Sequence, residues 1–446
     1  ADLVKTDGEY IYQVNEQRIV VVKAFPAETM KIASVINFED EFRPLELYVD
    51  DKCLVVIGSA YNENSLLKAK SLKPQIYPPY YREGTTKAVI YDLSNKANLT
   101  KLREIELEGD YVSSRKIGSA LYLIANKNIN YYHIMEQDAA NFTPGYRDSA
   151  KQDGFVSINY GDIHYFPGSI VPNYLIIAGL DLAKQNEEAN ISTYLGAGQN
   201  IYASQGNLYI AVTEFKPVST TNTLIYKFGL QNGQVDFQVS GEVPGRVLNQ
   251  FSMDEYNKNF RIVTTVGDIW RTDEGTSKNN VYILDHKLKT IGKLENIAPG
   301  EQVYSVRFLG ERGYVVTFKT VDPLFVIDLK NPNKPQILGA LKIPGYSDYL
   351  HPYDENHIIG FGKDTEEVSQ KDWQGNAADS IALYQGMKIA LFDVTDVNKP
   401  IEKYKEIIGG RGTDSELLRN HKALLFAKDK NLLAFPVTVM EVKDRS

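Results

Sequence analysis

The feature that most constrains this chain is an internal repeat of short strand patterns, seen most clearly in residues 301–345. Four strand-like segments follow one another there, at 304–309, 314–318, 324–329 and 337–343. The second and third are nearly continuous apolar runs, which suits strands that are covered on both faces. Polar turns separate the segments, and the prolines between the third and fourth cannot continue a ladder. This unit is therefore predicted to be a four-stranded antiparallel meander.

The same template can be followed along all 446 residues. Most units end in Gly or Pro-Gly, and a single sheet of this kind cannot bury both of its faces, so neighbouring units must stack around a ring. We predict an all-β fold: a single β-propeller of four-stranded antiparallel blades, eight in number with seven as the alternative, the last blade being incomplete in this chain. The predicted blades span approximately residues 1–40, 44–109, 110–196, 197–244, 245–300, 301–345, 346–410 and, in part, 411–446.

Composition excludes several classes of function. The net charge of −8 and a pI near 5.5 argue against a nucleic-acid or anionic-membrane partner, because both require a concentrated basic surface. No apolar run approaches the ~18 residues that a transmembrane helix needs. A single cysteine, Cys53, rules out an internal disulfide and a cysteine-based metal cluster. We predict no cofactor; acidic turns at Asp254-Glu255 and Asp354-Glu355 leave structural calcium open, but they lack the spacing of a calcium loop.

Aligning the repeats indicates a first set of candidate site residues. Arg115, Arg307 and His351 each lie three residues before the turn that ends a first strand. The first strand of a propeller blade lines the central channel, so these side chains are predicted to point toward one axis. Arginine suits a carboxylate or phosphate ligand, and histidine can act as a base or a metal ligand. We favour the alternative that each pairs with a carboxylate or carbonyl between blades, since buried charges are usually paired.

A second recurrence is an aspartate that closes the third strand, and it occurs at Asp92, Asp285, Asp328 and Asp393. Four carboxylates suggest a catalytic or metal site. They belong to different blades, however, and each precedes turn residues onto whose N–H groups an aspartate readily folds back. We therefore predict that these aspartates cap turns.

The third candidate set lies in long insertions between second and third strands. They are predicted at residues 61–86, 127–172, 268–279 and 364–385, all on one face of the disc, because this connection leaves an antiparallel meander on one side. Long loops on a rigid frame often carry function, and aromatic residues are enriched at recognition surfaces. The candidate binding residues of this face are Trp270, Trp373, Tyr80, Tyr81 and Tyr132. The alternative is that the loops pack together as a lid with an aromatic core of its own.

Long stretches of this sequence are similar to a known family. The runs VPGRVLNQFSMDEYNKNFRIVTT, APGEQVYSVRFLGERGYVVTFKTVDPLFVIDL and IPGYSDYLHPYDENHIIGFGKDT, the opening ADLVKTDGEYIY, and the segment from Tyr146-Arg147-Asp148-Ser149 to Tyr165-Phe166-Pro167 resemble the secreted β-propeller-domain proteins of bacteria and archaea, a family distantly related to WD40 repeats. The resemblance implies a propeller and an extracytoplasmic location. It implies no reaction, and the opening of the chain shows no signal peptide.

Two functions are open at this point. We predict a secreted or surface binding platform that presents the insertion-bearing face to a polymer, peptide or protein ligand. The alternative is a hydrolase or lyase that uses the channel residues Arg115, Arg307 and His351. The fold cannot decide between them, because propellers serve both uses. A convergent acid/base pair with perturbed pKa values would favour the enzyme.

Overall fold

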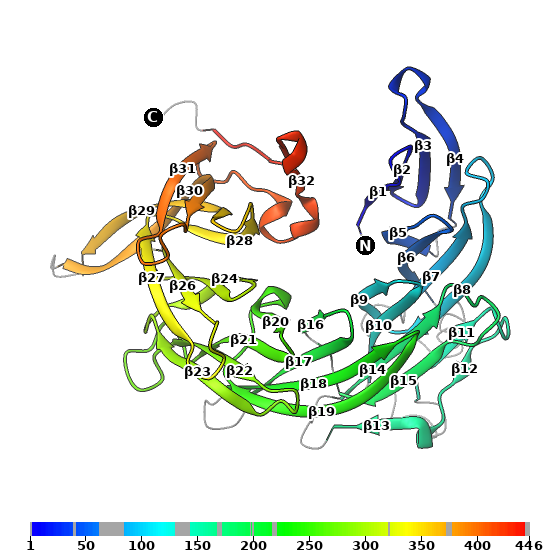
Figure 1. Cartoon of the computed structure of the whole chain (residues 1–446), viewed down its shortest axis with the longest axis horizontal. Coiled ribbons are helices and arrows are strands. Elements are labelled where there is room, and N and C mark those ends of the chain that lie inside the picture. The colour runs from blue at the N-terminus through cyan, green and yellow to red at the C-terminus, as the bar shows by residue number, and fades with distance from the viewer. Residues whose placement is uncertain are drawn as a thin grey trace, which may run out of the picture. The chain divides into compact units, whose positions relative to one another are not determined.

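The computed structural model describes residues 2–38, 42–61, 84–129, 143–166, 172–196, 198, 200–215, 221–319, 322–371 and 377–441. Within these residues the protein is all-β, with short 3-10 turns and no α-helix. The strands form eight sheets, of which seven contain an antiparallel meander of four strands that are consecutive in the sheet (Figure 1). The predicted all-β fold and its repeating four-stranded unit are therefore confirmed.

The chain divides into two compact units. The first comprises Ala1–Gln199, Gln205–Leu208 and Phe228–Gln238, and the second comprises Asn200–Ser204, Tyr209–Lys227 and Val239–Ser446. The first unit contains three complete sheets. Their meander strands are β1 (Val4–Thr6), β2 (Tyr10–Asn15), β3 (Arg18–Lys23) and β4 (Lys31–Asn37); β5 (Phe42–Val49), β6 (Cys53–Tyr61), β7 (Gly84–Asp92) and β8 (Thr100–Glu108); and β9 (Asp110–Ile117), β10 (Ala120–Asn128), β14 (Asn173–Asp181) and β15 (Asn190–Leu195).

The fourth sheet supplies residues to both units, and the others belong to the second unit. The fourth contains β16 (Asn200–Ala203), β17 (Asn207–Phe215), β18 (Thr221–Gln231) and β19 (Gln234–Pro244). The fifth to seventh contain β20 (Met253–Tyr256), β21 (Asn259–Val266), β22 (Lys278–Leu284) and β23 (Thr290–Ile297); β24 (Gln302–Leu309), β25 (Arg312–Phe318), β26 (Asp322–Asp328) and β27 (Gln336–Ile343); and β28 (Tyr346–Pro352), β29 (His357–Lys371), β30 (Ala377–Asp393) and β31 (Ile401–Ile408).

The chain ends on a short eighth sheet of two strands, β32 (Leu425–Ala427) and β33 (Leu432–Ala434). Short 3-10 turns surround it at η5 (Glu416–Leu418), η6 (His421–Ala423) and η7 (Lys428–Lys430), and others lie at η1 (Ala27–Thr29), η3 (Tyr160–Asp162) and η4 (Gln250–Ser252). Beyond β33, Thr438 exchanges backbone hydrogen bonds with Asp414. The sequence predicts an exposed strand edge at residues 437–439, to be paired by further strands or covered by another segment. In the structure, the backbone of Asp414 pairs with Thr438 at this edge.

The hydrophobic core lies between successive sheets within each unit. In the first unit, Val55 and Ile90 of the second sheet pack with Leu121 and Ile176 of the third. In the second unit, separate clusters join the fourth sheet to the fifth, the fifth to the sixth and the sixth to the seventh. The apolar central strands of each meander are buried on both faces for this reason.

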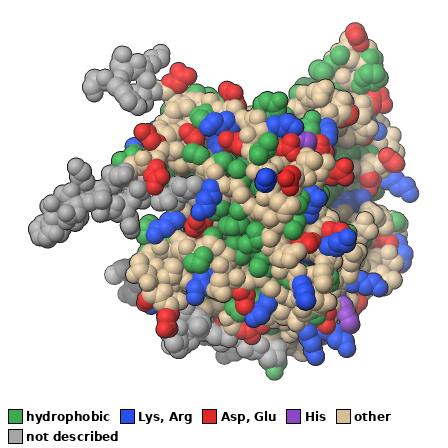
Figure 2. Space-filling model, turned by 60° about the vertical axis from the view of Figure 1, so that its left-hand side comes forward, with side chains coloured by type: hydrophobic (Ala, Val, Ile, Leu, Met, Phe, Trp, Pro, Cys, Tyr) green, Lys and Arg blue, Asp and Glu red, His purple; other side chains and the backbone are tan. Residues whose placement is uncertain are grey.

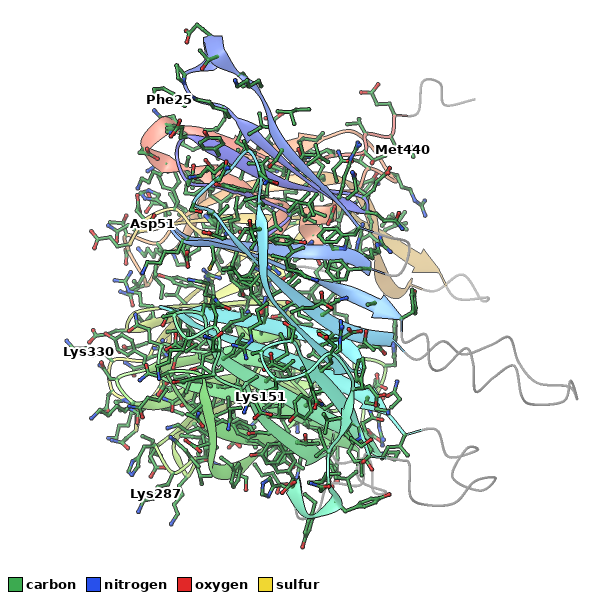
Figure 3. The ribbon with its side chains drawn as sticks, turned by 90° about the vertical axis from the view of Figure 1, so that its right-hand side faces the viewer. Phe25, Asp51, Lys151, Lys287, Lys330 and Met440 are labelled. Atoms are coloured by element: carbon green, nitrogen blue, oxygen red, sulfur yellow. The ribbon has the colours of Figure 1, made fainter. Side chains whose placement is uncertain are left out.

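The turn that joins the third and fourth strands packs closely on the preceding sheet. A Cβ atom at Gly292 in β23 would lie 1.9 Å from the carbonyl oxygen of Pro332, and one at Gly339 in β27 would lie 2.4 Å from that of Val397. Glycine is required at these two positions because a neighbouring backbone occupies the space of a side chain. Lys287 and Lys330, in two of these turns, lie on the same side of the molecule (Figure 3). The connections between second and third strands leave the opposite ends of these sheets.

The insertions differ in part from the predicted loops. Most of 61–86 lies outside the described residues. The described parts of 127–172 add strands to sheet edges: β11 (Gly145–Asp148) pairs with β8 and with β12 (Val156–Ser157), and β13 (Ile163–Tyr165) runs parallel to β15. The segment 364–385 continues β29 and β30 as a hairpin arm rather than a loop. These strands were not predicted from the sequence, because strands of an exposed arm need no apolar run.

Candidate binding surface

Trp270 lies in the connection between β21 and β22, which is a well-organised loop. The backbone N–H of Asp268 donates to the carbonyl of Gly275 at 2.9 Å, and that of Ser277 donates to the carbonyl of Asp268 at 3.0 Å. The carboxylate of Asp268 accepts from the N–H of Trp270 at 3.0 Å. Arg271 forms a bidentate pair with Asp273 across the loop. The indole of Trp270 itself is 81% exposed.

These contacts bear on the two predicted states of this insertion. A lid would bury Trp270 in an aromatic core, whereas the loop is held by its own hydrogen bonds and presents the indole to solvent. For this loop the exposure of Trp270 favours the binding surface. The other predicted residues of this face, Trp373, Tyr80, Tyr81 and Tyr132, lie outside the described residues.

Of the three channel candidates, two come together in the second unit. Arg307 lies on β24 and His351 on β28, and the positive charge of Arg307 acts on the His351 ring. Arg115 lies on β9 in the first unit, where its guanidinium donates to the carbonyl of Ser114 at 2.8 Å. The repeat alignment thus places Arg307 and His351 at equivalent positions of adjacent strands, as the sequence predicts.

Aromatic side chains surround Arg307 and His351. The guanidinium of Arg307 lies 5.3 Å from the ring centre of Phe251 in η4, and Nδ1 of His351 lies 3.1 Å from the hydroxyl of Tyr349. The ring of His421 in η6 packs edge-on against Phe251 at 4.8 Å. Within the described ranges, no carboxylate lies within ion-pair distance of Arg307 or His351. The prediction was a carboxylate or carbonyl partner between blades; among the described contacts, these two side chains pack against aromatic rings.

Burial lowers the pKa of His351, and the positive charge of Arg307 lowers it further. The imidazole is therefore neutral at neutral pH, able to donate through one nitrogen and accept through the other. Beside it, a guanidinium without a carboxylate partner suits an anionic or strongly accepting ligand group. This cluster can hold a ligand, but it does not pair a general acid with a general base.

Sequence reasoning missed a further polar cluster. One of its members, Asp348, lies three residues before His351. The cluster consists of Asp348 on β28, Lys363 on β29, and Asp414 and Arg419 of the C-terminal segment. Arg419 binds the carboxylate of Asp414 at 2.6 Å, and Lys363 approaches the same carboxylate at 3.3 Å. The signal that finds Asp348 is again the internal repeat, applied three positions earlier than the channel residues.

The recurring aspartates are turn caps, as predicted. Asp92 accepts from the N–H of Ser94, Asp285 from that of Lys287, Asp328 from that of Lys330 and Asp393 from that of Thr395, each at 2.9–3.0 Å. Two other acidic turn residues are engaged in ion pairs, Asp254 with Arg261 and Asp354 with Lys428, and Asp354 also hydrogen-bonds His357. Among the described residues, no group of three or more His, Cys, Asp or Glu side chains is placed to hold a metal ion. A helix long and apolar enough to cross a membrane is likewise missing from the described part of the chain.

Comparison with known proteins places this architecture in a family. A sequence profile described as "Beta propeller domain" matches residues 1–446. An uncharacterized protein of Methanocaldococcus jannaschii is 30% identical over 449 residues, which cover 91% of this chain and 67% of that protein. An uncharacterized protein of Archaeoglobus fulgidus is 40% identical over 214 residues, which cover 48% of this chain and 29% of that protein.

Solved structures also resemble the chain at low similarity. An acylaminoacyl peptidase of Pyrococcus horikoshii matches 90% of this chain and 50% of its own, with 11% identity and a TM-score of 0.35. At that level the similarity carries no argument about activity. The profile, in contrast, extends over the whole sequence, and the chain belongs to the beta propeller domain family.

Proposed function

We propose that this protein is a binding platform whose ligand contacts the end of the sheets that carries the second-to-third-strand connections. One observation carries the proposal: the indole of Trp270 is 81% exposed on a loop that its own hydrogen bonds hold in place. Tryptophan offers a large contact area and an indole N–H that can donate a hydrogen bond, and it dominates the energetics of many interfaces. A loop ordered before binding also loses little entropy when a ligand arrives.

The class of ligand follows from charge and from the family resemblance. The face drawn in Figure 2 carries side chains of both signs interspersed, without a broad basic field. For the proposed binding face, the net charge of −8 supports a polymer, peptide or protein ligand rather than a nucleic acid. The resemblance to secreted propellers supports an extracytoplasmic location.

We also infer that the sheets are the blades of one eight-bladed propeller. Seven of them contain a complete four-stranded meander, and the last sheet has two strands. Two further strands beside β32 and β33 would give the eighth sheet the composition of the other seven. Such a ring would supply the rigid frame on which the Trp270 loop acts as a recognition element.

A hydrolase or lyase is the second candidate, and one observation favours it. His351 has a lowered pKa next to Arg307, an arrangement that suits a general base beside an electrostatic stabiliser. Within the described ranges, however, no carboxylic acid or second base faces His351 to complete an acid/base pair. The binding function therefore has the stronger support.

The direct test replaces Trp270 by Ala and measures binding to two printed arrays, one of oligosaccharides and one of peptides. We expect at least one probe to lose about tenfold or more in affinity, which corresponds to about 1.4 kcal/mol or more. Tyr404→Ala is the matched control, because Tyr404 is an exposed aromatic residue on the outer strand β31 and is 67% exposed. It should leave binding unchanged.

Thermal unfolding of the same variants separates binding from folding. Because the Trp270 side chain makes little contact with the protein, Trp270→Ala should leave the melting temperature within about 1 °C of the parent protein. A large drop in melting temperature, or equal losses of binding in Trp270→Ala and Tyr404→Ala, would contradict the proposal.

A further inference from the structure

The first strands of four sheets share a β-bulge at one equivalent position. In each, one residue of the first strand has no partner on the second strand, so the register of the ladder shifts by one. Each bulged residue lies three positions before Tyr48, Arg115, Arg307 or His351. The bulged residues are Leu45, Val112, Tyr304 and Asp348.

Asp348 is the exception in this series. The other three sheets place an aliphatic or aromatic side chain at the bulge, and all four positions are half-buried. The fold therefore accepts an apolar residue here, and the seventh sheet uses an ionisable one instead. Asp348 thus departs from the repeat at a cost in stability and without a structural contact in return. Such a departure is typical of a functional residue.

The surroundings of Asp348 give its carboxyl group no fixed partner. Its two cationic neighbours, Lys363 and Arg419, are both held by the carboxylate of Asp414. No described residue donates a hydrogen bond to Asp348. Burial raises the pKa of Asp348 to about 7, whereas the hydrogen bond from Arg419 holds that of Asp414 at about 2. Near neutral pH, the Asp348 carboxyl group is thus both a donor and an acceptor.

Hydrogen bonds connect this carboxyl group's neighbours to the Trp270 loop. The guanidinium of Arg246 donates to the carbonyl of Gly267, where that loop begins, and to the side-chain oxygen of Gln302. Gln302 in turn hydrogen-bonds the hydroxyl of Tyr304, which also hydrogen-bonds Tyr384.

Aromatic rings complete the connection. Tyr304 packs on Tyr346 with ring centres 4.9 Å apart, and Tyr346 packs on Tyr384 at 5.4 Å. The carboxyl group of Asp348 interacts with both Tyr304 and Tyr346, and Tyr384, at the base of the hairpin arm, is 47% exposed. Polar and aromatic side chains therefore link the Trp270 loop to Tyr304, Tyr346 and Tyr384, and the charge of Asp348 acts on the first two of these tyrosines.

We propose that Asp348 and Tyr384 form, with Trp270, the binding site for a neutral carbohydrate chain. The proposal rests on the binding function and names its ligand class. Sugar rings offer apolar faces that stack on aromatic side chains and hydroxyl groups that both donate and accept hydrogen bonds. The row of Gln302, Tyr304 and Tyr384 supplies such groups, and Asp348 supplies a carboxyl group that no protein donor occupies.

Charge separates this ligand class from the others. Asp414 pairs with both cations, Lys363 and Arg419, so neither is free for an anionic polymer, and a protonated Asp348 does not attract a cationic one. A protein ligand would need an apolar centre around its aromatic anchors, whereas the aromatic neighbours of Tyr384 in this row, Tyr304 and Tyr346, each carry a hydroxyl group.

The experiment measures binding to an array of neutral, N-acetylated and uronic-acid oligosaccharides, with a peptide array in parallel. Asp348→Leu installs the residue that the second sheet carries at the same bulge. We expect Asp348→Leu and Tyr384→Ala each to weaken binding of a neutral oligosaccharide at least tenfold, while Tyr404→Ala retains it. Asp348→Leu should also raise the melting temperature, because it removes a half-buried carboxyl group without a partner. Loss of binding with a gain in stability cannot come from misfolding.

A pH profile gives a second readout. A sugar that covers Asp348 removes further water from the carboxyl group and so favours its protonated form. Affinity for the neutral oligosaccharide should therefore fall as the pH rises from 6 to 8 in the parent protein, and it should stay constant in Asp348→Asn.

The outcomes separate the two proposals. If Trp270→Ala abolishes binding of a peptide probe while Asp348→Leu has no effect, the binding function stands and the carbohydrate site is wrong. If only uronic-acid probes bind, the neutral ligand class is wrong. If Asp348→Leu lowers the melting temperature, Asp348 is a structural residue. If no probe depends on Trp270, both proposals fail.

Discussion

At the scale of single residues, the same side-chain types serve different purposes in different surroundings. The aspartates that close third strands fold onto turn N–H groups, and their position in the repeat was enough to predict this. Asp348 has no such partner, and only comparison with Leu45, Val112 and Tyr304 distinguishes it. Arg307 and His351 were found by the same alignment, but their aromatic partners come from distant segments whose packing a sequence does not reveal.

One prediction at this scale concerns the electrostatic coupling of Arg307 to His351. The histidine has a lowered pKa, so the unfolded chain binds more protons than the folded protein as the pH falls below about 6.5. Its contribution to stability is present above that pH and is lost as the pH falls toward the folded-state pKa. Arg307→Gln removes the positive charge, and the pKa of His351 should then rise toward 6.5.

The measurement is an NMR titration of the histidine side chains in the parent protein and in Arg307→Gln. Burial remains in the variant, so the His351 pKa should still lie below its ordinary value. Arg411→Gln is a control at an exposed arginine of the same unit and should leave the titration unchanged. An unchanged His351 pKa in Arg307→Gln would show that the two groups are not coupled.

At the scale of elements, the segment from Tyr146 to Ser149, which is one of the stretches similar to the family, has a structural role. Arg147 bonds Glu106 at 2.9 Å, and Asp148 accepts a bidentate pair from the buried guanidinium of Arg103 on β8. Although burial opposes its charge, these hydrogen bonds hold the pKa of Asp148 below its ordinary value. This motif therefore fixes β11 to the edge of the second sheet.

A second prediction belongs to the contact between neighbouring sheets. Gly339→Ala would place a Cβ atom 2.4 Å from the carbonyl oxygen of Val397, which is backbone and cannot swing away. We expect a loss of about 1–3 kcal/mol in the free energy of unfolding, as for other overpacked sites. Urea denaturation measures it. Gly154→Ala, where nothing lies within 4 Å of the added Cβ, is the control and should change little; equal stability of both variants would contradict the close approach.

At the scale of the whole molecule, the sequence predicts the all-β meanders well because apolar periodicity records burial between sheets. The hairpin arm of β29 and β30 escaped prediction, since strands exposed on both faces leave no apolar run. The state of the Trp270 loop was also undecided, because an aromatic residue in an insertion fits a lid and a binding surface equally well. The hydrogen bonds of Asp268 and the Arg271–Asp273 pair hold this loop, and the exposed indole of Trp270 favours the binding surface.

Fluorescence of Trp270, measured with and without ligand, shows whether this residue lies on the binding surface. The chain has two tryptophans, so Trp373→Phe leaves Trp270 as the sole indole. The account predicts the red-shifted emission of a hydrated indole and ready quenching by acrylamide in the free protein. Addition of an oligosaccharide or peptide that binds on the arrays should shift the emission to the blue and protect it from quenching. Blue-shifted, protected emission in the free protein, or a spectrum unchanged by a saturating ligand, would contradict the claim that Trp270 lies on the binding surface.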